Sequence, residues 1–165
     1  MSGITVRAAQ SGDYSLISDI LAAAFAGTDE ENLVRRLRQD KDVVLELVAL
    51  NDETVIGQIL FSRLKVTGAQ EFDAVALAPL AVLPACQGQG AGSKLVRTAH
   101  AQLAAAGEIL SVVLGEPEYY GRFGYERQSA AGFESAHQGD YLQAFAFGDA
   151  PRSGKLIYAP AFGAL

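Results

Sequence analysis

The segment 74–106 constrains the fold of this chain more than any other, because it joins an apolar run, a glycine-rich loop and an amphipathic helix. The run Ala74–Leu83 is apolar at nearly every position, which is typical of a strand buried on both faces of a covered sheet. Pro79 interrupts this run, and a proline cannot donate a hydrogen bond to a neighbouring strand. We therefore predict a central strand that bulges at Pro79.

The rest of the chain alternates between strand-like and helix-like patterns. Short apolar runs rich in β-branched residues predict strands, with a hairpin around the loop 51–54, and apolar residues at helical spacing predict helices. The predicted strands are 4–7, 43–50, 55–66, 74–83, 109–114, 141–147 and 156–158. The predicted helices start after an N-cap at Asp13, at Asp29, after the glycine loop and at Pro117. The third helix is expected to bury Leu95, Val96, Ala99, Leu103 and Ala106 and to end at Gly107. This order predicts a mixed α/β sheet.

Length and composition exclude several classes of protein. The chain has 165 residues, so we expect residues 1–165 to form a single domain. It has one cysteine, which excludes an internal disulfide, and its N-terminus lacks the apolar core of a signal peptide, so a reducing cytoplasm is the expected compartment. The uncharged segment 74–93 contains prolines and glycines, so no membrane span is expected. A net charge of −6 argues against nucleic acid as the main partner.

Three glycines at alternate positions, Gly88, Gly90 and Gly92, lie between the apolar strand and the amphipathic helix. Glycine lets the backbone approach a ligand closely, and the first turn of a helix has N–H groups without internal partners. The loop therefore predicts a cradle for phosphate or pyrophosphate. The Walker motif does not fit, because Lys94 follows Ser93 instead of preceding it, and the dinucleotide motif does not fit, because Ser93 occupies its third glycine position.

Two motifs in the chain resemble those of the GNAT acetyltransferase superfamily. The arrangement of Gln87, Gly90 and Gly92 after a strand is similar to the acetyl-CoA-binding signature of that superfamily. The segment 119–125, Tyr-Tyr-Gly-Arg-Phe-Gly-Tyr, is similar to its aromatic landmark and lies about 30 residues later, in the expected order. The resemblance extends over the whole chain and implies a mixed, mostly antiparallel sheet that is flanked by helices and has splayed central strands.

Two further segments, 114–120 and 158–162, are similar to the YhbS-type branch of the superfamily. The resemblance implies an N-acetyltransferase that binds acetyl-CoA and a primary amine together and transfers the acetyl group directly, without a metal. It implies that the splayed strand pairs with the pantetheine arm, that the glycine loop binds the pyrophosphate, and that Tyr120 acts as general acid. The implied cofactor-binding residues are Leu80, Ala81, Val82, Gln87, Gly88, Gln89, Gly90, Ala91, Gly92 and Ser93.

The residue that takes a proton from the amine is not assigned by the resemblance. Many members of the superfamily have a glutamate on the fourth strand, where this chain has only the apolar residues 75–78. Glu116, Glu31 and a water relay are the alternatives. Lys94 and Arg97 could add positive charge at the cofactor phosphates, although an exposed helix face is the expected position of both.

The remaining residues with reactive or ligating side chains are expected to be structural. Tyr119 is expected to pack in the core, and Cys86 is expected to be a small apolar residue. His100 and His137 have no partner at metal-ligand spacing, so no metal site is expected.

Two functions of another class stay open besides the enzyme. A CoA-binding sensor or partner module without transfer activity is favoured by the missing strand glutamate and opposed by Tyr120, and a nucleotide-phosphate binder is the third hypothesis. The sequence does not specify the amine acceptor or the acyl-chain length, and a homodimer is compatible with it.

Overall fold

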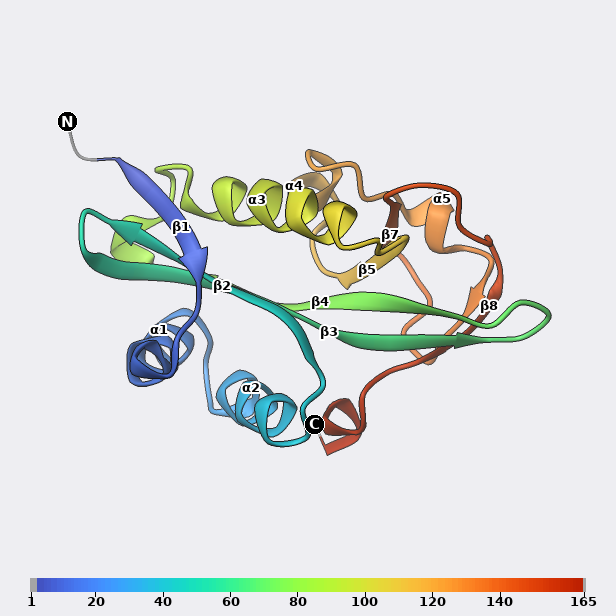
Figure 1. The fold of residues 1–165 in the computed structure, drawn as a ribbon, viewed down its shortest axis with the longest axis horizontal. Coiled ribbons are helices and arrows are strands. Elements are labelled where there is room, and N and C mark those ends of the chain that lie inside the picture. The colour runs from blue at the N-terminus through green and yellow to red at the C-terminus, as the bar shows by residue number, and fades with distance from the viewer. Residues whose placement is uncertain (1–2, 165) are drawn as a thin grey trace.

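A computed structural model describes residues 3–164, which form an eight-stranded sheet with helices on both faces (Figure 1). The strands are β1 (Ile4–Ala8), β2 (Val43–Asn51), β3 (Thr54–Thr67), β4 (Phe72–Val82), β5 (Leu110–Leu114), β6 (Phe133–Glu134), β7 (Leu142–Ala146) and β8 (Gly154–Ile157). The α-helices are α1 (Tyr14–Ala24), α2 (Asp29–Gln39), α3 (Ala91–Ala105), α4 (Pro117–Gly121) and α5 (Arg127–Ala130). The 3₁₀ helices are η1 (Ser11–Asp13), η2 (Pro84–Cys86) and η3 (Pro160–Ala164).

The strands lie in the order β1-β2-β3-β4-β5-β7, and β8 pairs with both β3 and β6. Neighbours in the first series are antiparallel except β4 and β5, which are parallel because α3 connects them as a strand–helix–strand unit. The predicted mixed sheet is therefore confirmed. The predicted hairpin of β2 and β3 is confirmed as well, with Asn51 paired to Thr54 across the turn.

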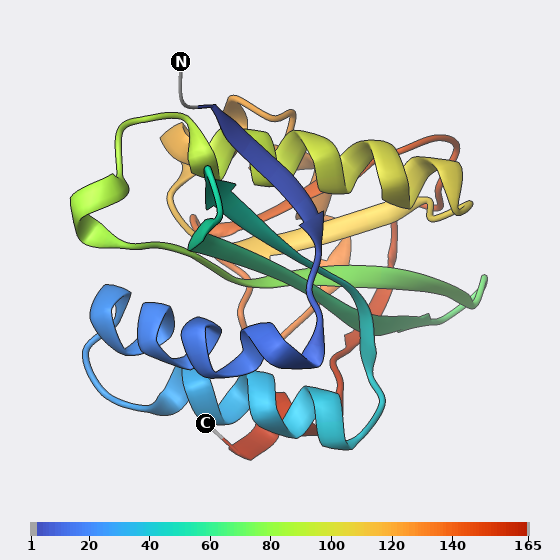
Figure 2. The same cartoon turned by 60° about the vertical axis from the view of Figure 1, so that its left-hand side comes forward.

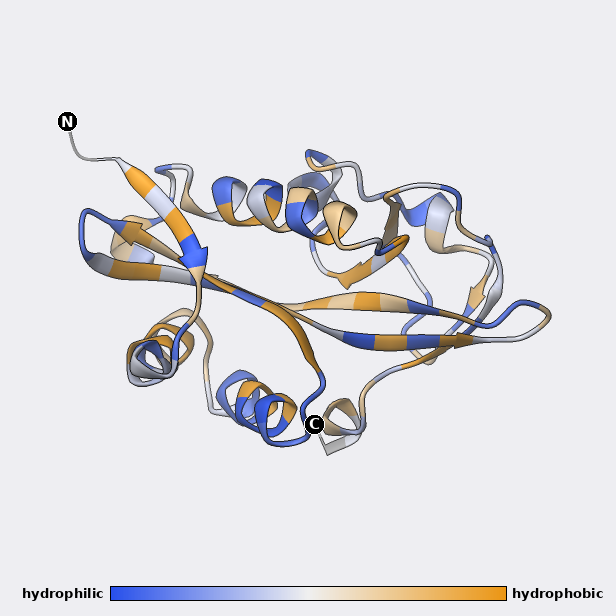
Figure 3. Cartoon of the chain, viewed as in Figure 1, coloured by the Kyte–Doolittle hydropathy of each residue, from blue (hydrophilic) through white to orange (hydrophobic). Residues whose placement is uncertain are grey.

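Helices cover the two faces of the sheet, as Figure 2 shows: α1 and α2 lie together on one face and α3 lies on the other. Each helix turns a stripe of apolar residues toward the strands, and its polar residues face outward (Figure 3). The fully or almost fully buried residues of these helices are Ile17, Ile20, Leu21, Leu33, Val34, Leu37, Ala91, Leu95, Val96, Ala99 and Leu103. Ala106 is exposed, contrary to prediction, because α3 ends one residue before it and Gly107 turns the chain away.

The predicted N-cap at Asp13 is only partly right. Asp13 directly precedes α1, but its side chain makes no capping hydrogen bond to that helix. Its carboxylate instead accepts two hydrogen bonds from the Arg7 guanidinium, at 2.6 and 3.0 Å, and one from the backbone N–H of Gln10 at 2.8 Å. These contacts hold the pKa of Asp13 below its usual value and tie the end of β1 to the start of α1.

Candidate active site

The centre of the sheet opens where β4 and β5 diverge. The two strands pair only from Val75 to Leu77, opposite Ser111 to Val113. On its other side, β4 stays paired with β3 as far as Val82. Ala78 and Pro79 of β4 lie opposite the single residue Leu60 of β3, which is the bulge that the sequence predicts. One edge of β4 beyond Pro79 is thus left without a neighbouring strand.

The backbone groups of Leu80 and Val82 lie on the open edge of β4. Leu83 donates its N–H to the carbonyl of Ile56 at 2.8 Å, so the odd-numbered residues here direct their polar groups toward β3. The even-numbered residues direct theirs toward the gap. Gln87 partly closes the gap at one end, since its Nε2 donates to the Val82 carbonyl oxygen at 3.1 Å.

The glycine loop leads from this edge into α3. Gly88 and Gly90 adopt φ angles of 79° and 90°, a left-handed region that residues with a Cβ rarely enter. The first α-helical backbone bond runs from the N–H of Lys94 to the carbonyl of Gly90 at 3.0 Å, so the preceding amides have no acceptor within the helix. These N–H groups and the positive end of the helix dipole make the loop suited to an anion, as the sequence predicts.

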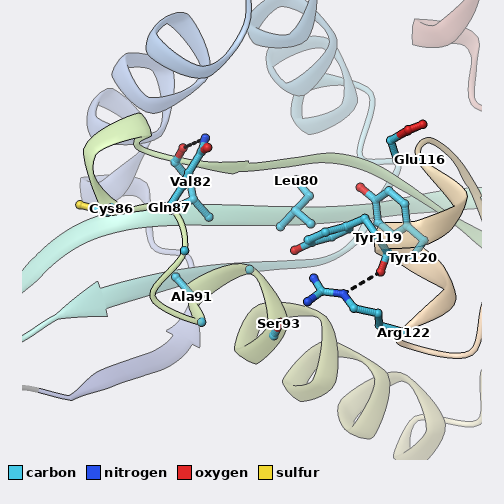
Figure 4. A pocket seen from close by; sticks show the side chains of 13 residues that line it. Leu80, Val82, Cys86, Gln87, Ala91, Ser93, Glu116, Tyr119, Tyr120 and Arg122 are labelled. Carbon is cyan, nitrogen blue, oxygen red and sulfur yellow. Dashed lines mark hydrogen bonds between the residues drawn. The ribbon is translucent and has the colours of Figure 1, made fainter.

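A cavity of about 610 Å³ extends from the glycine loop along the open edge of β4 to α4 (Figure 4). It brings together most of the residues that the family resemblance implies for cofactor binding. Its lining consists of Leu80, Val82, Cys86, Gln87, Gly88, Gly90, Ala91, Gly92, Ser93, Glu116, Tyr119, Tyr120 and Arg122. Two implied residues lie elsewhere: Ala81 is buried beside β3, and Gln89 lines a separate surface depression with Lys94.

Tyr120 stands at the end of the cavity that is farthest from the glycine loop (Figure 4). Its ring packs so closely on Gly115 that a Cβ at that position would lie 2.5 Å from the Tyr120 Cε2 atom. Its other face meets the ring of Tyr119 edge-on, with centroids 5.0 Å apart. Burial raises the pKa of Tyr120 to about 12, so its hydroxyl is protonated at neutral pH.

Tyr119 packs against the hydrophobic core, as predicted, but it is only half-buried and also lines the cavity. Its hydroxyl lies against Gly92, where an added Cβ would come within 2.4 Å of the hydroxyl oxygen. A Cβ at position 92 would therefore displace the Tyr119 hydroxyl from the first turn of α3. The two adjacent tyrosines thus line different parts of the cavity: the Tyr119 hydroxyl lies near the glycine loop, and the Tyr120 ring lies at the far end.

Arg122 supplies a cation to this cavity that the sequence analysis missed. Its guanidinium lies 4.5 Å from the centroid of the Tyr119 ring, and its Nε donates to the backbone carbonyl of Tyr119 at 3.3 Å. Arg97, by contrast, stacks on Phe123 from the exposed side of α3, and Lys94 donates to the carbonyl of Ile4, away from the cavity. The only signal for Arg122 was its position inside the aromatic motif.

A second cavity, of about 520 Å³, lies on the face of the sheet that α2 covers. It shares Leu80, Glu116 and Tyr120 with the first cavity, so the two meet at the gap between β4 and β5. The rest of its lining comes from Phe25, Glu30, Leu33, Ala76, Leu77, Ala78, Pro79, Val112, Val113, Leu114, Gly115, His137, Tyr158 and Phe162. Glu30 lines it in place of the predicted Glu31, whose carboxylate is paired with Arg35 at 2.9 Å.

A cluster of hydrogen-bonded polar side chains, Ser111, His100 and Tyr125, packs next to α4 and contacts Tyr120 through the Tyr125 ring. The Tyr125 hydroxyl lies 2.8 Å from Ser111 Oγ and 3.0 Å from His100 Nε2, and the His100 ring stacks on Phe145 with centroids 4.7 Å apart. Tyr125 in turn meets the Tyr120 ring edge-on at 5.9 Å. Burial, aided by the nearby charge of Arg97, lowers the pKa of His100 to about 4.

His100 should make the stability of the protein depend on pH. The unfolded state binds a proton near pH 6.5 and the folded state only near pH 4, so stability is lost as the pH falls through this window. We expect the wild type to lose about 1–2 kcal/mol more than His100→Phe between pH 7 and 4.5, allowing for solvent screening of a partly exposed ring. Urea unfolding of both proteins at the two pH values measures this difference, and parallel losses would contradict the assignment.

Two further properties of the described chain bear on the site. Within residues 3–164, no three His, Cys, Asp or Glu side chains come together in a way that could hold a metal ion. None of the helices in this part of the chain is long and apolar enough to span a lipid bilayer.

The sequence and the fold of the chain were compared with those of known proteins. The family model described as "Acetyltransferase (GNAT) domain" matches residues 5–128, which include the whole of the loop and α4. The chain belongs to the GNAT acetyltransferase family. The predicted family is therefore confirmed, and with it the enzyme class: this GNAT protein is an acyltransferase of the acetyl-CoA-dependent type.

Among curated relatives, this GNAT chain is similar to two N-acetyltransferases of Escherichia coli that are described as uncharacterized. It is 35% identical to YjhQ over 74% of this chain and 69% of the relative, and 40% identical to YhbS over 67% of this chain and 66% of the relative. The matched region thus spans about two-thirds of the length of each relative. The similarity to YhbS supports the predicted branch of the family.

Two solved GNAT structures share the fold over almost the entire chain. The YhbS protein of Escherichia coli, solved in complex with CoA, has a TM-score of 0.90 and 30% identity and covers 99% of this chain and 93% of its own. A GNAT family acetyltransferase of Brucella melitensis, solved in complex with acetyl-CoA, has a TM-score of 0.82 and 34% identity, with coverage of 97% and 98%.

Proposed function

We propose that this protein, as one catalytic domain, transfers an acetyl group from acetyl-CoA to a primary amine by direct attack while both substrates are bound. The observation that carries the proposal is the meeting of two cavities at Leu80, Glu116 and Tyr120. A donor in one cavity and an acceptor in the other would place the reacting atoms side by side, which lowers the entropic barrier to reaction. The complexes of the two similar structures with CoA and acetyl-CoA support the choice of donor.

The donor would lie in the 610 Å³ cavity. The free amides at the start of α3 suit its pyrophosphate, and the backbone groups of Leu80 and the N–H of Val82, on the open edge of β4, suit the amide groups of its pantetheine arm. Arg122 adds a positive charge to the same wall. Ala81 holds β4 against β3 in this arrangement, and Gln89 would contribute through its backbone, because its side chain lies outside the cavity.

The reaction forms one bond and breaks one. The amine nitrogen bonds to the thioester carbonyl carbon, the carbon–sulfur bond breaks, and the sulfur keeps the bonding electron pair. An amine that arrives as ammonium first gives up one proton to become the neutral nucleophile; during transfer the nitrogen then loses one further proton and the sulfur gains one, so the products are an amide and a thiol. Tyr120, at the junction of the cavities, is placed to donate a hydrogen bond to the departing sulfur.

The raised pKa of Tyr120 defines how it would act. A phenol with a pKa of about 12 is a much weaker acid than a thiol, whose reference pKa is near ~8.5. Complete proton transfer to the thiolate is therefore uphill by about 1.4 kcal/mol for each pKa unit between them. Tyr120 would stabilise the developing thiolate mainly as a hydrogen-bond donor, and proton exchange with solvent would complete the step.

Glu116 is our candidate for the residue that accepts the proton of the amine. It lies two residues after the end of β5, at the start of α4, and lines both cavities, whereas residues 75–78 of β4 are apolar. Its carboxylate would attract the incoming ammonium group and accept its proton, either directly or through a water molecule. This assignment replaces the strand glutamate that many relatives use.

Parallel calorimetry with CoA, ATP and NAD tests which ligand the first cavity binds. We expect CoA to bind at least tenfold more tightly than either nucleotide, because only its pantetheine arm reaches from the loop to Tyr120. Equal affinities would instead indicate a nucleotide-phosphate binder. A thiol-release assay with acetyl-CoA and a broad amine library then separates the enzyme from the sensor, which would bind CoA without turnover of any amine.

A further inference from the structure

The second cavity differs from the first in its chemistry. Its floor consists of apolar residues from the facing stretches of β4 and β5, and Leu33 of α2 closes one side. An aromatic wall completes it: the Tyr158 ring meets His137 edge-on, with centroids 5.5 Å apart, and the tilted ring of Phe162 at 5.4 Å. Leu114 lies at the end of β5 with 52% of its surface exposed, so apolar surface continues outward from the cavity.

Two carboxylates, those of Glu30 and Glu116, also line this largely apolar cavity. Among residues 3–164, Glu30 and Glu116 make no ion pair with a lysine or arginine. Other glutamates of the chain are paired, such as Glu46 with Arg38 at 2.5 Å and Glu108 with Arg63 at 2.9 Å. A carboxylate beside an apolar cavity gains most from a ligand that brings a positive charge.

We propose that the acceptor is a small primary amine carried on an apolar body, and that Glu30 recognises its ammonium form before the nitrogen reaches Glu116. This inference rests on the proposed function and specifies its substrate class. The apolar body would pack between the β4–β5 floor and the Tyr158–Phe162 wall. A cavity of 520 Å³ lies in the ordinary range for a whole small ligand.

The same lining disfavours strongly polar amines. An aminoglycoside would bury many hydroxyl groups against apolar residues that cannot hydrogen-bond them, at a cost for each unpaired group. A polyamine such as spermidine would have to lose the hydration of its additional charges, which the apolar floor and aromatic wall do not replace. Discrimination therefore comes from unmatched polar groups as much as from favourable apolar contact.

The test compares amines in a thiol-release assay with saturating acetyl-CoA at pH 7.5. We expect kcat/KM for phenethylamine and n-hexylamine to exceed the values for spermidine and kanamycin at least tenfold. Calorimetry with phenethylamine in the presence of CoA, which cannot transfer an acetyl group, measures acceptor binding independently of turnover. Binding of phenethylamine but not of spermidine or kanamycin supports the inference in the same way as selective turnover does.

A matched pair of variants tests the role of Glu30. Glu30→Gln should raise KM for phenethylamine about tenfold at pH 7.5 with little change in kcat, and this effect should shrink near pH 10, where more of the amine is neutral. Glu31→Gln is the control, because Glu31 is the next residue of α2 but is paired with Arg35 outside the cavity. Equal effects of the two variants would overturn the assignment of Glu30.

The outcomes separate the two levels of the proposal. Turnover of spermidine or kanamycin, without turnover or binding of phenethylamine and n-hexylamine, would overturn the inferred substrate class and leave the acetyltransferase assignment intact. A protein that binds neither CoA nor any of the four amines would overturn the proposed function itself. Wild-type selectivity for the two apolar amines, together with a KM for phenethylamine that rises at pH 7.5 on Glu30→Gln but not on Glu31→Gln, is the result that supports both.

Discussion

Tyr120→Phe should reduce kcat about 10²- to 10³-fold while leaving the dissociation constant of CoA within about twofold of the wild-type value. The substitution removes only a hydroxyl group, and the ring would keep its contacts with Gly115, Tyr119 and Tyr125. Acetyl-CoA would thus still bind, but the departing thiolate would lose the hydroxyl that donates a hydrogen bond to it. Steady-state thiol release and calorimetry with CoA measure the two quantities separately.

Two comparisons make this expectation specific. Tyr141→Phe is the control, because Tyr141 is 56% exposed and lines neither cavity, and it should leave both quantities unchanged. Tyr119→Phe removes the hydroxyl beside Gly92 and should affect CoA affinity more than kcat. A Tyr120→Phe protein with wild-type kcat would exclude Tyr120 as the acid.

The pKa of Tyr120 adds a further check to the same experiment. Because burial raises this pKa to about 12, the hydroxyl stays protonated and able to donate through pH 10. Ionisation of Tyr120 should therefore not lower the wild-type rate below pH 10. Any decline of the rate in that range should be present in Tyr120→Phe as well. A decline near pH 9 that Tyr120→Phe abolishes would mean that the tyrosine ionises far more easily than its buried position implies.

Gly90→Ala should weaken CoA binding at least tenfold. Gly90 has a φ of 90°, and an alanine there would favour a negative φ that turns the adjacent amides away from the anion cradle. A Cβ at this position would meet no atom within 4 Å, so the expected loss comes from backbone conformation and not from crowding. Calorimetry with CoA measures the affinity, and urea unfolding measures the accompanying loss of about 1 kcal/mol in stability.

Gly107→Ala provides the matched control at the other end of α3. Gly107 also has a φ of 90° and also has open space where a Cβ would lie. This variant should lose a similar amount of stability yet bind CoA within about twofold of the wild type. If the two variants bound CoA equally well, the glycine loop would have no special part in holding the cofactor.

The elements of the sheet could be predicted because their sequence patterns are local. The apolar run of β4, the β-branched runs of β2 and β3, and the helical spacing in α2 each determine which residues are buried. The bulge followed from the single physical fact that Pro79 lacks an N–H group. The anion cradle of the first cavity followed from the glycine loop, whereas its other predicted residues, Leu80, Val82 and Tyr120, followed from the resemblance to the GNAT superfamily.

The second cavity could not be predicted in the same way, because it joins side chains from distant parts of the chain. Its aromatic wall comes from Tyr158 and Phe162, more than 75 residues beyond the β4 floor that it faces. Glu31 was named as a candidate base, but the helical spacing of the sequence points to Glu30 as the residue that faces the cavity. Glu30 precedes the buried residues Leu33, Val34 and Leu37 by three, four and seven positions, so it shares their helix face.

Asp13 and Tyr119 show a second limit of local patterns. An aspartate before a helix is typical of an N-cap, but in this fold the Arg7 guanidinium lies close enough to bind it. Core packing of Tyr119 was expected because the matching family position is usually an apolar aromatic; Tyr119 does pack against the core, but the first turn of α3 also leaves room for its hydroxyl at Gly92. In both cases a partner on another element decides what the polar end of the side chain contacts.

The two cavities differ in how freely their residues can diverge. Substitutions at Leu80, Glu116 or Tyr120 would alter both cavities at once, because each of these residues lines both. Tyr158 and Phe162 border only the acceptor cavity and lie beyond residue 128, where the match to the family model ends. Substitutions in the carboxyl-terminal segment could thus change which amines such an enzyme accepts without changing how it binds acetyl-CoA.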